Sequence, residues 1–295
     1  HDFQPTTQDV LAMQRADVVF MQGAELEPWG DDLRAQLATQ QVPVFVATAE
    51  IDLHESAEHE HGHDEEHEHE DEHNHHEDAG GEHEHEAEHE HEHEAEHAHH
   101  EQHEDGHEGE HEDEHEHDHH HHHGEYDPHT WLDPVLLGET AAHAAEALSA
   151  LDPENAAVYA DNLATLQADL AALHDQFVGT LQNCSFEEAI TTHDSMGYVA
   201  ERYGLAFHAI AGLSTQDMPS ATTMADLREE AAEGVGAILL EENAVTAYGE
   251  TLARETGLTT YAINPIAFAI PAGENYLTLQ QQNLTSLAAA FGCNG

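Results

Sequence analysis

Short apolar runs alternate with amphipathic segments over the first fifty residues of the chain. A helix over residues 6–15, with a threonine as its cap, precedes an apolar strand over 17–21. A helix over 28–39 and a second strand over 42–47 follow. Strand, helix and strand at this spacing predict parallel strands that are covered by helices.

Helical periodicity dominates the middle of the chain. Residues 135–150 are predicted to form a helix, with Asp133 as its cap and Pro134 at its first position. A longer helix starts at Asp152-Pro153 and carries one apolar stripe at steps of three and four residues. The stripe consists of Leu163, Leu166, Leu170, Leu173, Phe177 and Leu181. About 28 residues at 1.5 Å each make a rod of roughly 40 Å, long enough to cross a domain boundary.

Strands and helices alternate again in the last third of the sequence. The predicted strands cover residues 186–192, 205–210, 237–241 and 259–263. Helices lie between and after these strands, one of them capped by Ser220. The fold class that follows is α/β, with two parallel-sheet lobes joined by a long rigid helix. The first lobe takes residues 1–51 and 125–152, the linking helix 153–182, and the second lobe 183–295.

A low-complexity tract of histidine and glutamate at residues 52–124 interrupts the first lobe. The segment from Asp52 to Asp127 holds 27 of the 33 histidines and 33 of the 63 acidic residues, with almost no apolar side chains. Such a segment cannot offset its ordering entropy, so we expect it to be disordered. Neutral imidazoles at pH 7 can bind metal, which predicts many weak, rapidly exchanging zinc sites. The alternative is a solvated polyelectrolyte with no functional role.

Outside the tract the chain is still acidic, with 30 acidic residues against five arginines and no lysine. This charge argues against nucleic acid and anionic lipid as partners and favours cations, although a saline habitat explains it equally well. No run of about 18 apolar residues predicts a membrane span. No signal peptide is visible, and the sequence begins at His1 rather than Met, so we expect an N-terminally incomplete copy.

The two cysteines, Cys184 and Cys293, have neither CxxC nor zinc-finger spacing. They fit one disulfide formed in an oxidising compartment, or two unrelated buried thiols. The residue pattern leaves both interpretations open.

Three of the six histidines outside the tract lie in loops at the ends of predicted elements. His1 and His129 each precede a helix, and His193 ends a predicted strand. A single loop histidine is more often a solvated or capping residue, but ligands of open α/β sheets gather outside the carboxyl ends of strands. Three imidazoles that meet there suit tetrahedral zinc. The other three lie within helices or a strand and are interpreted as packing or surface residues: His143, His174 and His208.

Five sequence blocks carry a resemblance to a known family. They are His1–Pro5, Tyr126–Pro134, His193–Tyr198, Gly212–Ser214 with Pro219-Ser220, and Leu240–Asn243. In this order they resemble the periplasmic zinc-binding proteins of ABC importers, a metal-specific family that also includes manganese-binding lipoproteins. The resemblance covers nearly the whole chain outside the tract and includes a His-rich insertion. Its most specific block is the one that contains His129.

The resemblance implies a metal held in a cleft between the two lobes, by His1 and His129 from the first lobe and His193 from the second. Manganese members tend to have Glu in place of His193, so an imidazole there favours zinc. The family often places an Asp ligand after a late strand, where this chain has Asn264. A neutral amide is a poor zinc ligand, so the fourth ligand is Asn264, water, a tract histidine or a nearby carboxylate. The glutamates at 241–242 are close in the pattern, with a capping or orienting role preferred for them.

The resemblance also implies a disulfide. Cys293 follows the last helix, as a bridging cysteine does in some zinc-type relatives, although its partner there lies at a later strand. Cys184 precedes the strand that leads to His193, and that strand can neighbour the later one in a parallel sheet. We therefore expect a bridge between Cys184 and Cys293.

The implied function is capture of zinc in the periplasm by a monomer that delivers it to an ABC-type membrane permease, with no reaction catalysed. One rival is a zinc buffer or sensor that acts mainly through the tract and would show only weak sites. A manganese carrier is disfavoured by His193. A zinc hydrolase would need a base aimed at metal-bound water, and the sequence has no HExxH motif.

Overall fold

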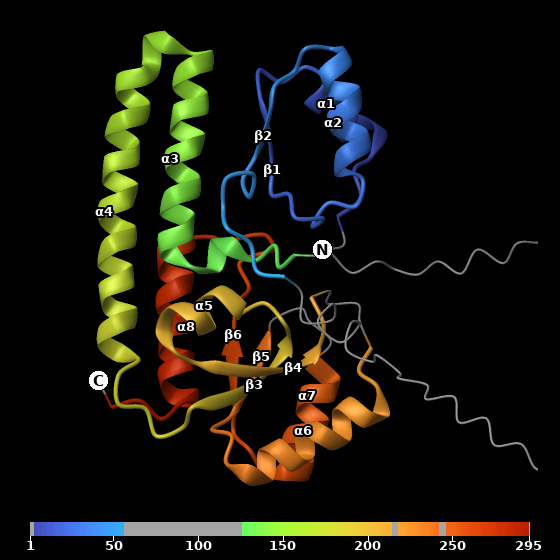
Figure 1. The fold of residues 1–295 in the computed structure, drawn as a ribbon, viewed down its shortest axis with the longest axis vertical. Helices are drawn as coiled ribbons and strands as arrows, with labels where there is room; N and C mark the ends of the chain where they lie inside the picture. The colour runs from blue at the N-terminus through green and yellow to red at the C-terminus, as the bar shows by residue number, and fades with distance from the viewer. Residues whose placement is uncertain (1–2, 56–125, 214–217, 242–245, 295) are drawn as a thin grey trace, which may run out of the picture. The chain divides into compact units, whose positions relative to one another are not determined.

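Two parallel β-sheets with covering helices organise the part of the chain that the computed structural model describes (Figure 1), which is residues 3–55, 126–213, 218–241 and 246–294. This arrangement confirms the predicted α/β class. The predicted disorder of the tract concerns residues 56–125, which lie outside the described residues.

The first sheet is a pair of short parallel strands. Its elements in chain order are α1 (Thr7–Met13), β1 (Val19–Met21), α2 (Gly30–Thr39) and β2 (Val44–Val46). Strand β1 pairs with β2 so that Val19 lies opposite Val44. The inward side chains of β1 pack on Leu33 and Leu37 of α2, which gives this sheet a small apolar core. Helix α2 begins at Gly30, two residues after Pro28, where the sequence predicted its start.

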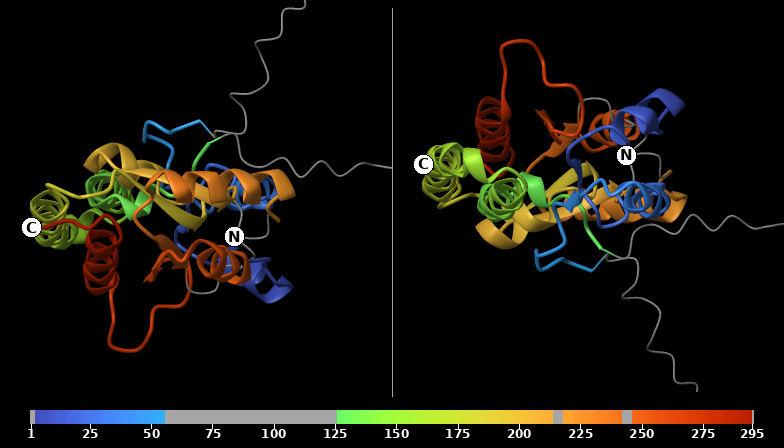
Figure 2. Two further views of the ribbon diagram at one scale, coloured as in Figure 1. Left: turned by 90° about the horizontal axis from the view of Figure 1, so that it is seen from below. Right: turned by 90° about the horizontal axis from the view of Figure 1, so that it is seen from above.

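Two long helices follow and run antiparallel side by side, as their end-on view in Figure 2 also shows. The elements are the 3-10 turn η2 (Thr130–Leu132), α3 (Pro134–Leu151), the 3-10 turn η3 (Pro153–Asn155) and α4 (Ala156–Thr180). Asp133 caps α3 as predicted, accepting a 2.8 Å hydrogen bond from Val135 N–H. None of the helices in the described ranges is long and apolar enough to cross a membrane.

The apolar stripe of α4 is buried over only half its length. Leu170, Leu173 and Phe177 are buried, whereas Leu166 is 36% exposed. The buried half packs against α8 and the second sheet. Periodicity therefore identified the correct face, and the neighbours of each turn decide how far that face is covered.

The second sheet has four parallel strands in the order β4-β3-β5-β6. Its elements are β3 (Glu188–His193), α5 (Gly197–Tyr203), β4 (Ala206–Ala211), α6 (Ala221–Glu233), β5 (Ile238–Glu241), α7 (Thr246–Thr256), β6 (Thr260–Ile263) and α8 (Tyr276–Ala290). Alternate residues of the two central strands face different cores, one shared with α6 and α7 and the other with α4, α5 and α8. Strands that are buried on both faces have nearly continuous apolar sequences. For this reason the strands of this half of the chain could be predicted from its sequence.

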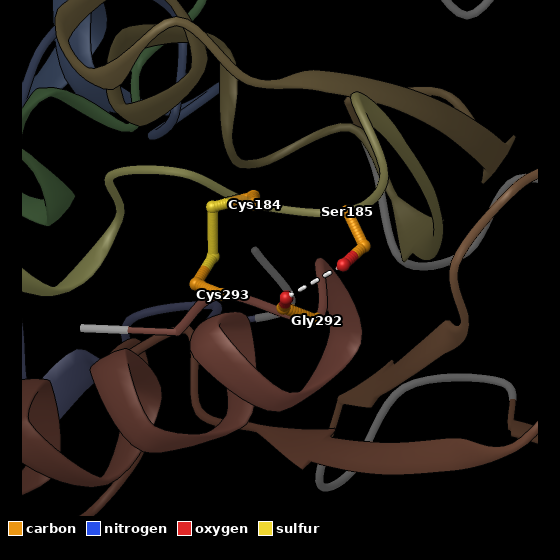
Figure 3. Close-up of a disulfide and its surroundings, with 4 residues drawn as sticks. All are labelled: Cys184, Ser185, Gly292 and Cys293. Atoms are coloured by element: carbon orange, nitrogen blue, oxygen red, sulfur yellow. Dashed lines mark hydrogen bonds between the residues drawn. A yellow bond between two sulfur atoms is a disulfide. The ribbon is translucent and has the colours of Figure 1, made fainter.

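A disulfide joins the two ends of this second half. Cys184 precedes β3 and Cys293 follows α8, and their sulfur atoms are bonded (Figure 3). Next to the bridge, the Ser185 hydroxyl donates a 3.1 Å hydrogen bond to the Gly292 carbonyl. The predicted pairing is confirmed.

Candidate metal centre

His129 is held in a rigid, buried turn just before η2. Its ring is fully buried, and the carboxylate of Asp127, two residues earlier, accepts a 2.8 Å hydrogen bond from its backbone N–H. The same carboxylate oxygen lies 2.7 Å from the ring Nδ1. Pro128 between them has a fixed φ, which limits the turn to few conformations. Asp127 therefore fixes both the backbone and the ring of His129.

His193 lies at the carboxyl end of β3, where the parallel strands deliver side chains to one edge of the sheet. Thr191 pairs with Leu239 of β5, and two residues further along, His193 lies beside Glu241. The Glu241 carboxylate contacts the ring Nδ1 of His193, and both side chains are buried. Glu241 is itself held, because its second carboxylate oxygen accepts a 2.8 Å hydrogen bond from the Ser195 hydroxyl.

The two rings point their remaining nitrogens at each other. Nε2 of His129 lies 3.4 Å from Nε2 of His193. An ionised carboxylate only accepts hydrogen bonds, so a ring that donates to it through Nδ1 leaves the lone pair of Nε2 for a metal. A tetrahedral zinc ion with bonds of about 2.05 Å places two ligand nitrogens about 3.3–3.4 Å apart. The separation of the two nitrogens is thus that of two ligands on one such ion.

Charge at this site also favours a cation. Asp127 and Glu241 are both buried, so their two formal negative charges are largely removed from water. Burying a charge is costly unless an opposite charge or a set of hydrogen bonds compensates it. A divalent ion bound by the two neutral imidazoles would balance both carboxylates through the rings.

The other two predicted ligands have different outcomes. His1 lies outside the described residues. Asn264 follows β6, where its side-chain oxygen accepts a 2.8 Å hydrogen bond from Ile266 N–H and its backbone pairs with the Asn283 amide. Within the described ranges no group of three histidine, cysteine or carboxylate side chains converges as a metal site. Ligand roles for His1 and Asn264 stay predictions.

The remaining histidines outside the tract contact other side chains. Nε2 of His143 lies 3.5 Å from Glu50, Nδ1 of His174 lies 3.0 Å from the Tyr203 hydroxyl, and His208 lies between two glutamates. These contacts agree with their interpretation as packing or surface residues.

Asp127 was not predicted from the sequence as a partner of His129. The signal was present, since a carboxylate two residues before a histidine, with proline between them, can fold back on the ring. His54 lies within the predicted tract boundaries and has a contact with the second half of the fold, because its Nε2 lies 2.5 Å from a Glu201 carboxylate oxygen.

Comparison with known proteins places the chain in a family. A family model described as zinc-uptake complex component A, periplasmic, matches residues 1–290. The chain is 34% identical over 168 residues to the zinc-binding lipoprotein AdcA of Streptococcus pneumoniae serotype 4, a match that covers 55% of this chain and 34% of AdcA. It is 29% identical over 292 residues to the high-affinity zinc uptake system protein ZnuA of Bacillus subtilis, covering 97% of this chain and 76% of that protein.

Solved structures show the same fold. The AdcAII protein of Streptococcus pneumoniae superimposes with a TM-score of 0.71 at 24% identity, covering 98% of this chain and 86% of AdcAII. The Zn(II)-bound ZnuA-like domain of AdcA from the same species gives a TM-score of 0.66 at 24% identity, with 99% and 86% of the two chains covered. The matches to the AdcA proteins span between about a third and a half of those relatives' length.

Proposed function

Because this chain belongs to the family of periplasmic zinc-uptake complex components A, we propose that it captures zinc with His129 and His193 and delivers it to an ABC-type membrane permease. The observation that carries the proposal is the 3.4 Å separation of two Nε2 atoms whose rings are each oriented by a buried carboxylate. Capture takes place in the periplasm, by a monomer that catalyses no reaction.

The geometry suits a carrier because the two ligands belong to different parts of the fold. His129 lies before α3, and His193 ends a strand of the second sheet. Both rings are pre-oriented, so little conformational freedom is lost when zinc binds. Release requires that the two rings move apart, after which the ion no longer has ligands from both parts of the fold.

Two further ligands complete the proposed coordination. His1 supplies a third imidazole, and the fourth position is taken by water, Asn264, a tract histidine or a nearby carboxylate. Three nitrogen donors favour zinc, which accepts imidazole readily and needs only four ligands. Manganese prefers oxygen donors and more of them.

Zinc titration against a chelator of known affinity tests the proposal. We expect one tight site in the parent and at least a hundredfold weaker binding in His129→Ala and His193→Ala, about 2.7 kcal/mol for each. His143→Ala, which removes a ring whose Nε2 lies 3.5 Å from a Glu50 carboxylate oxygen, is the matched control and should bind like the parent. His193→Glu should weaken zinc relative to manganese.

Equal zinc affinity in the parent and both alanine variants would show that this pair is not the site. A titration with weak sites only would favour the zinc buffer that acts through the tract.

A further inference from the structure

The two chain segments that flank residues 56–125 meet beside His129. Glu55 and Tyr126 form an antiparallel bridge, and Asp127 N–H donates a 2.9 Å hydrogen bond to the His54 carbonyl. These four residues, His54, Glu55, Tyr126 and Asp127, are called the neck below. The neck includes Asp127, the residue whose carboxylate holds the ring of His129.

One side chain from helix α5 contacts both chain segments of the neck. The Tyr198 hydroxyl, on α5, donates a 2.8 Å hydrogen bond to the Asp127 carbonyl and accepts one of 3.1 Å from His54 N–H. Its ring stacks on the His54 ring with centroids 4.2 Å apart. Burial raises the pKa of Tyr198, so the phenol keeps the proton that it donates.

The neck also approaches the start of α5 too closely for a side chain. A Cβ on Gly197 would lie 2.8 Å from the second carboxylate oxygen of Asp127 and 3.7 Å from Nδ1 of His54. The neck is therefore packed against α5 at Gly197 as well as hydrogen-bonded to Tyr198. These contacts place the Asp127 carboxylate at a fixed distance from His129.

We infer that Tyr198 is a positioning residue that holds the neck closed and thereby aims the Asp127 carboxylate at Nδ1 of His129. With Nδ1 held, Nε2 of His129 faces Nε2 of His193. The inference rests on the proposed function, because it assumes that this histidine pair binds zinc. It adds that zinc affinity depends on a hydroxyl that does not touch the ion.

Chain connectivity does not close the neck by itself. Seventy residues, 56–125, connect Glu55 to Tyr126, and a connection of that length does not force its ends together. An Asn-Gly connection between residues 56 and 125 does, because it forms the tight turn of a β-hairpin one pair beyond Glu55 and Tyr126 and keeps the hydrogen bond from Asp127 N–H to the His54 carbonyl. The hydroxyl of Tyr198 should thus be needed for tight zinc binding in the natural chain. It should not be needed when the connection between the two sides of the neck is short.

The test compares Tyr198→Phe with Tyr203→Phe in the full chain. Tyr203 is on the same helix, but its hydroxyl contacts His174 and not the neck. We expect zinc binding about tenfold weaker in Tyr198→Phe, the loss of roughly 1.4 kcal/mol, and unchanged binding in Tyr203→Phe. The visible spectrum of bound Co²⁺ should change only in Tyr198→Phe. In the metal-free protein, the downfield proton signal of the His129 Nδ1–H should also change in Tyr198→Phe and stay unchanged in Tyr203→Phe.

Replacing residues 57–124 by Asn-Gly should restore parent affinity to Tyr198→Phe within about twofold. A tenfold loss that persists in this background, or equal effects of the two phenylalanine variants, would overturn the inference. Absence of tight zinc binding in the parent would instead refute the proposed function. The His129 proton signal reports on positioning in either case, since it needs no metal.

Discussion

At the scale of single residues, each histidine of the pair has its own carboxylate, and the two carboxylates arrive in different ways. Asp127 is two residues from His129 and reaches it through a local turn. Glu241 is 48 positions from His193 along the chain and reaches it through strand register. Both leave Nε2 facing the other ring, which is the arrangement that the proposed zinc site requires.

Glu241→Gln tests the orienting carboxylate of His193. A neutral amide holds the Nδ1 proton less strongly and removes a buried negative charge, so we expect zinc binding to weaken by about 10- to 100-fold. Isothermal titration in the presence of a competing chelator measures the change. Glu230→Gln is the control, because Glu230 lies 3.1 Å from Nδ1 of His208 and should not affect zinc. Equal affinities in the parent and Glu241→Gln would mean that the Glu241 charge has no part in binding.

Sequence position was enough to select residues that lie together in the fold, whereas their ligand role stays a prediction. His129 and His193 were selected because one precedes a helix and the other ends a strand, and the structure brings them together. Glu241 was named as an orienting residue, but its partner was unknown because strand order is not written in the local sequence. The part played by Tyr198 was beyond reach, since it depends on a contact between residues 144 positions apart.

At the scale of elements, the side chains that cap helices could be predicted from the sequence, whereas the extent of burial could not. Asp133 and Ser220 cap α3 and α6 where their sequence context indicates. Asp133 is also contacted by Arg202 of α5, which no local pattern predicts. The first half of the α4 stripe is less buried than its periodicity suggests, because a helical period reports a face and not the neighbours that cover it.

The disulfide belongs to this scale because it connects the segment before β3 to the segment after α8. Replacing both Cys184 and Cys293 by serine should lower the free energy of unfolding by about 2–4 kcal/mol, since the bridge closes a loop of 109 positions. Urea unfolding of the parent, the double variant and the reduced parent measures this. Zinc affinity should be unchanged, because the bridge precedes β3 and His193 is at the other end of that strand. An unfolding free energy equal to that of the parent would contradict the prediction.

At the scale of the whole molecule, two kinds of metal binding are expected in one chain, and they can be separated. Replacing residues 57–124 by Asn-Gly should leave one tight zinc site and remove most weak ones. The reason is that His129 and His193, the proposed ligands of the tight site, lie outside the replaced segment, whereas 26 of the 33 histidines lie within it. Stoichiometry by equilibrium dialysis with radioactive zinc measures both classes. Loss of the tight site would place its ligands in the tract and refute the pair as the centre.

The neck has a consequence for engineering. Glu55 and Tyr126 are adjacent, so the chain leaves the fold and returns to it at nearly one point. A foreign domain whose own termini are close together could be spliced in there without stretching the surrounding fold. A circularly permuted fluorescent protein placed between these two residues would be attached, through Asp127, to the turn that carries His129. Its emission would then report occupation of the histidine pair, which would turn the molecule into an optical zinc probe.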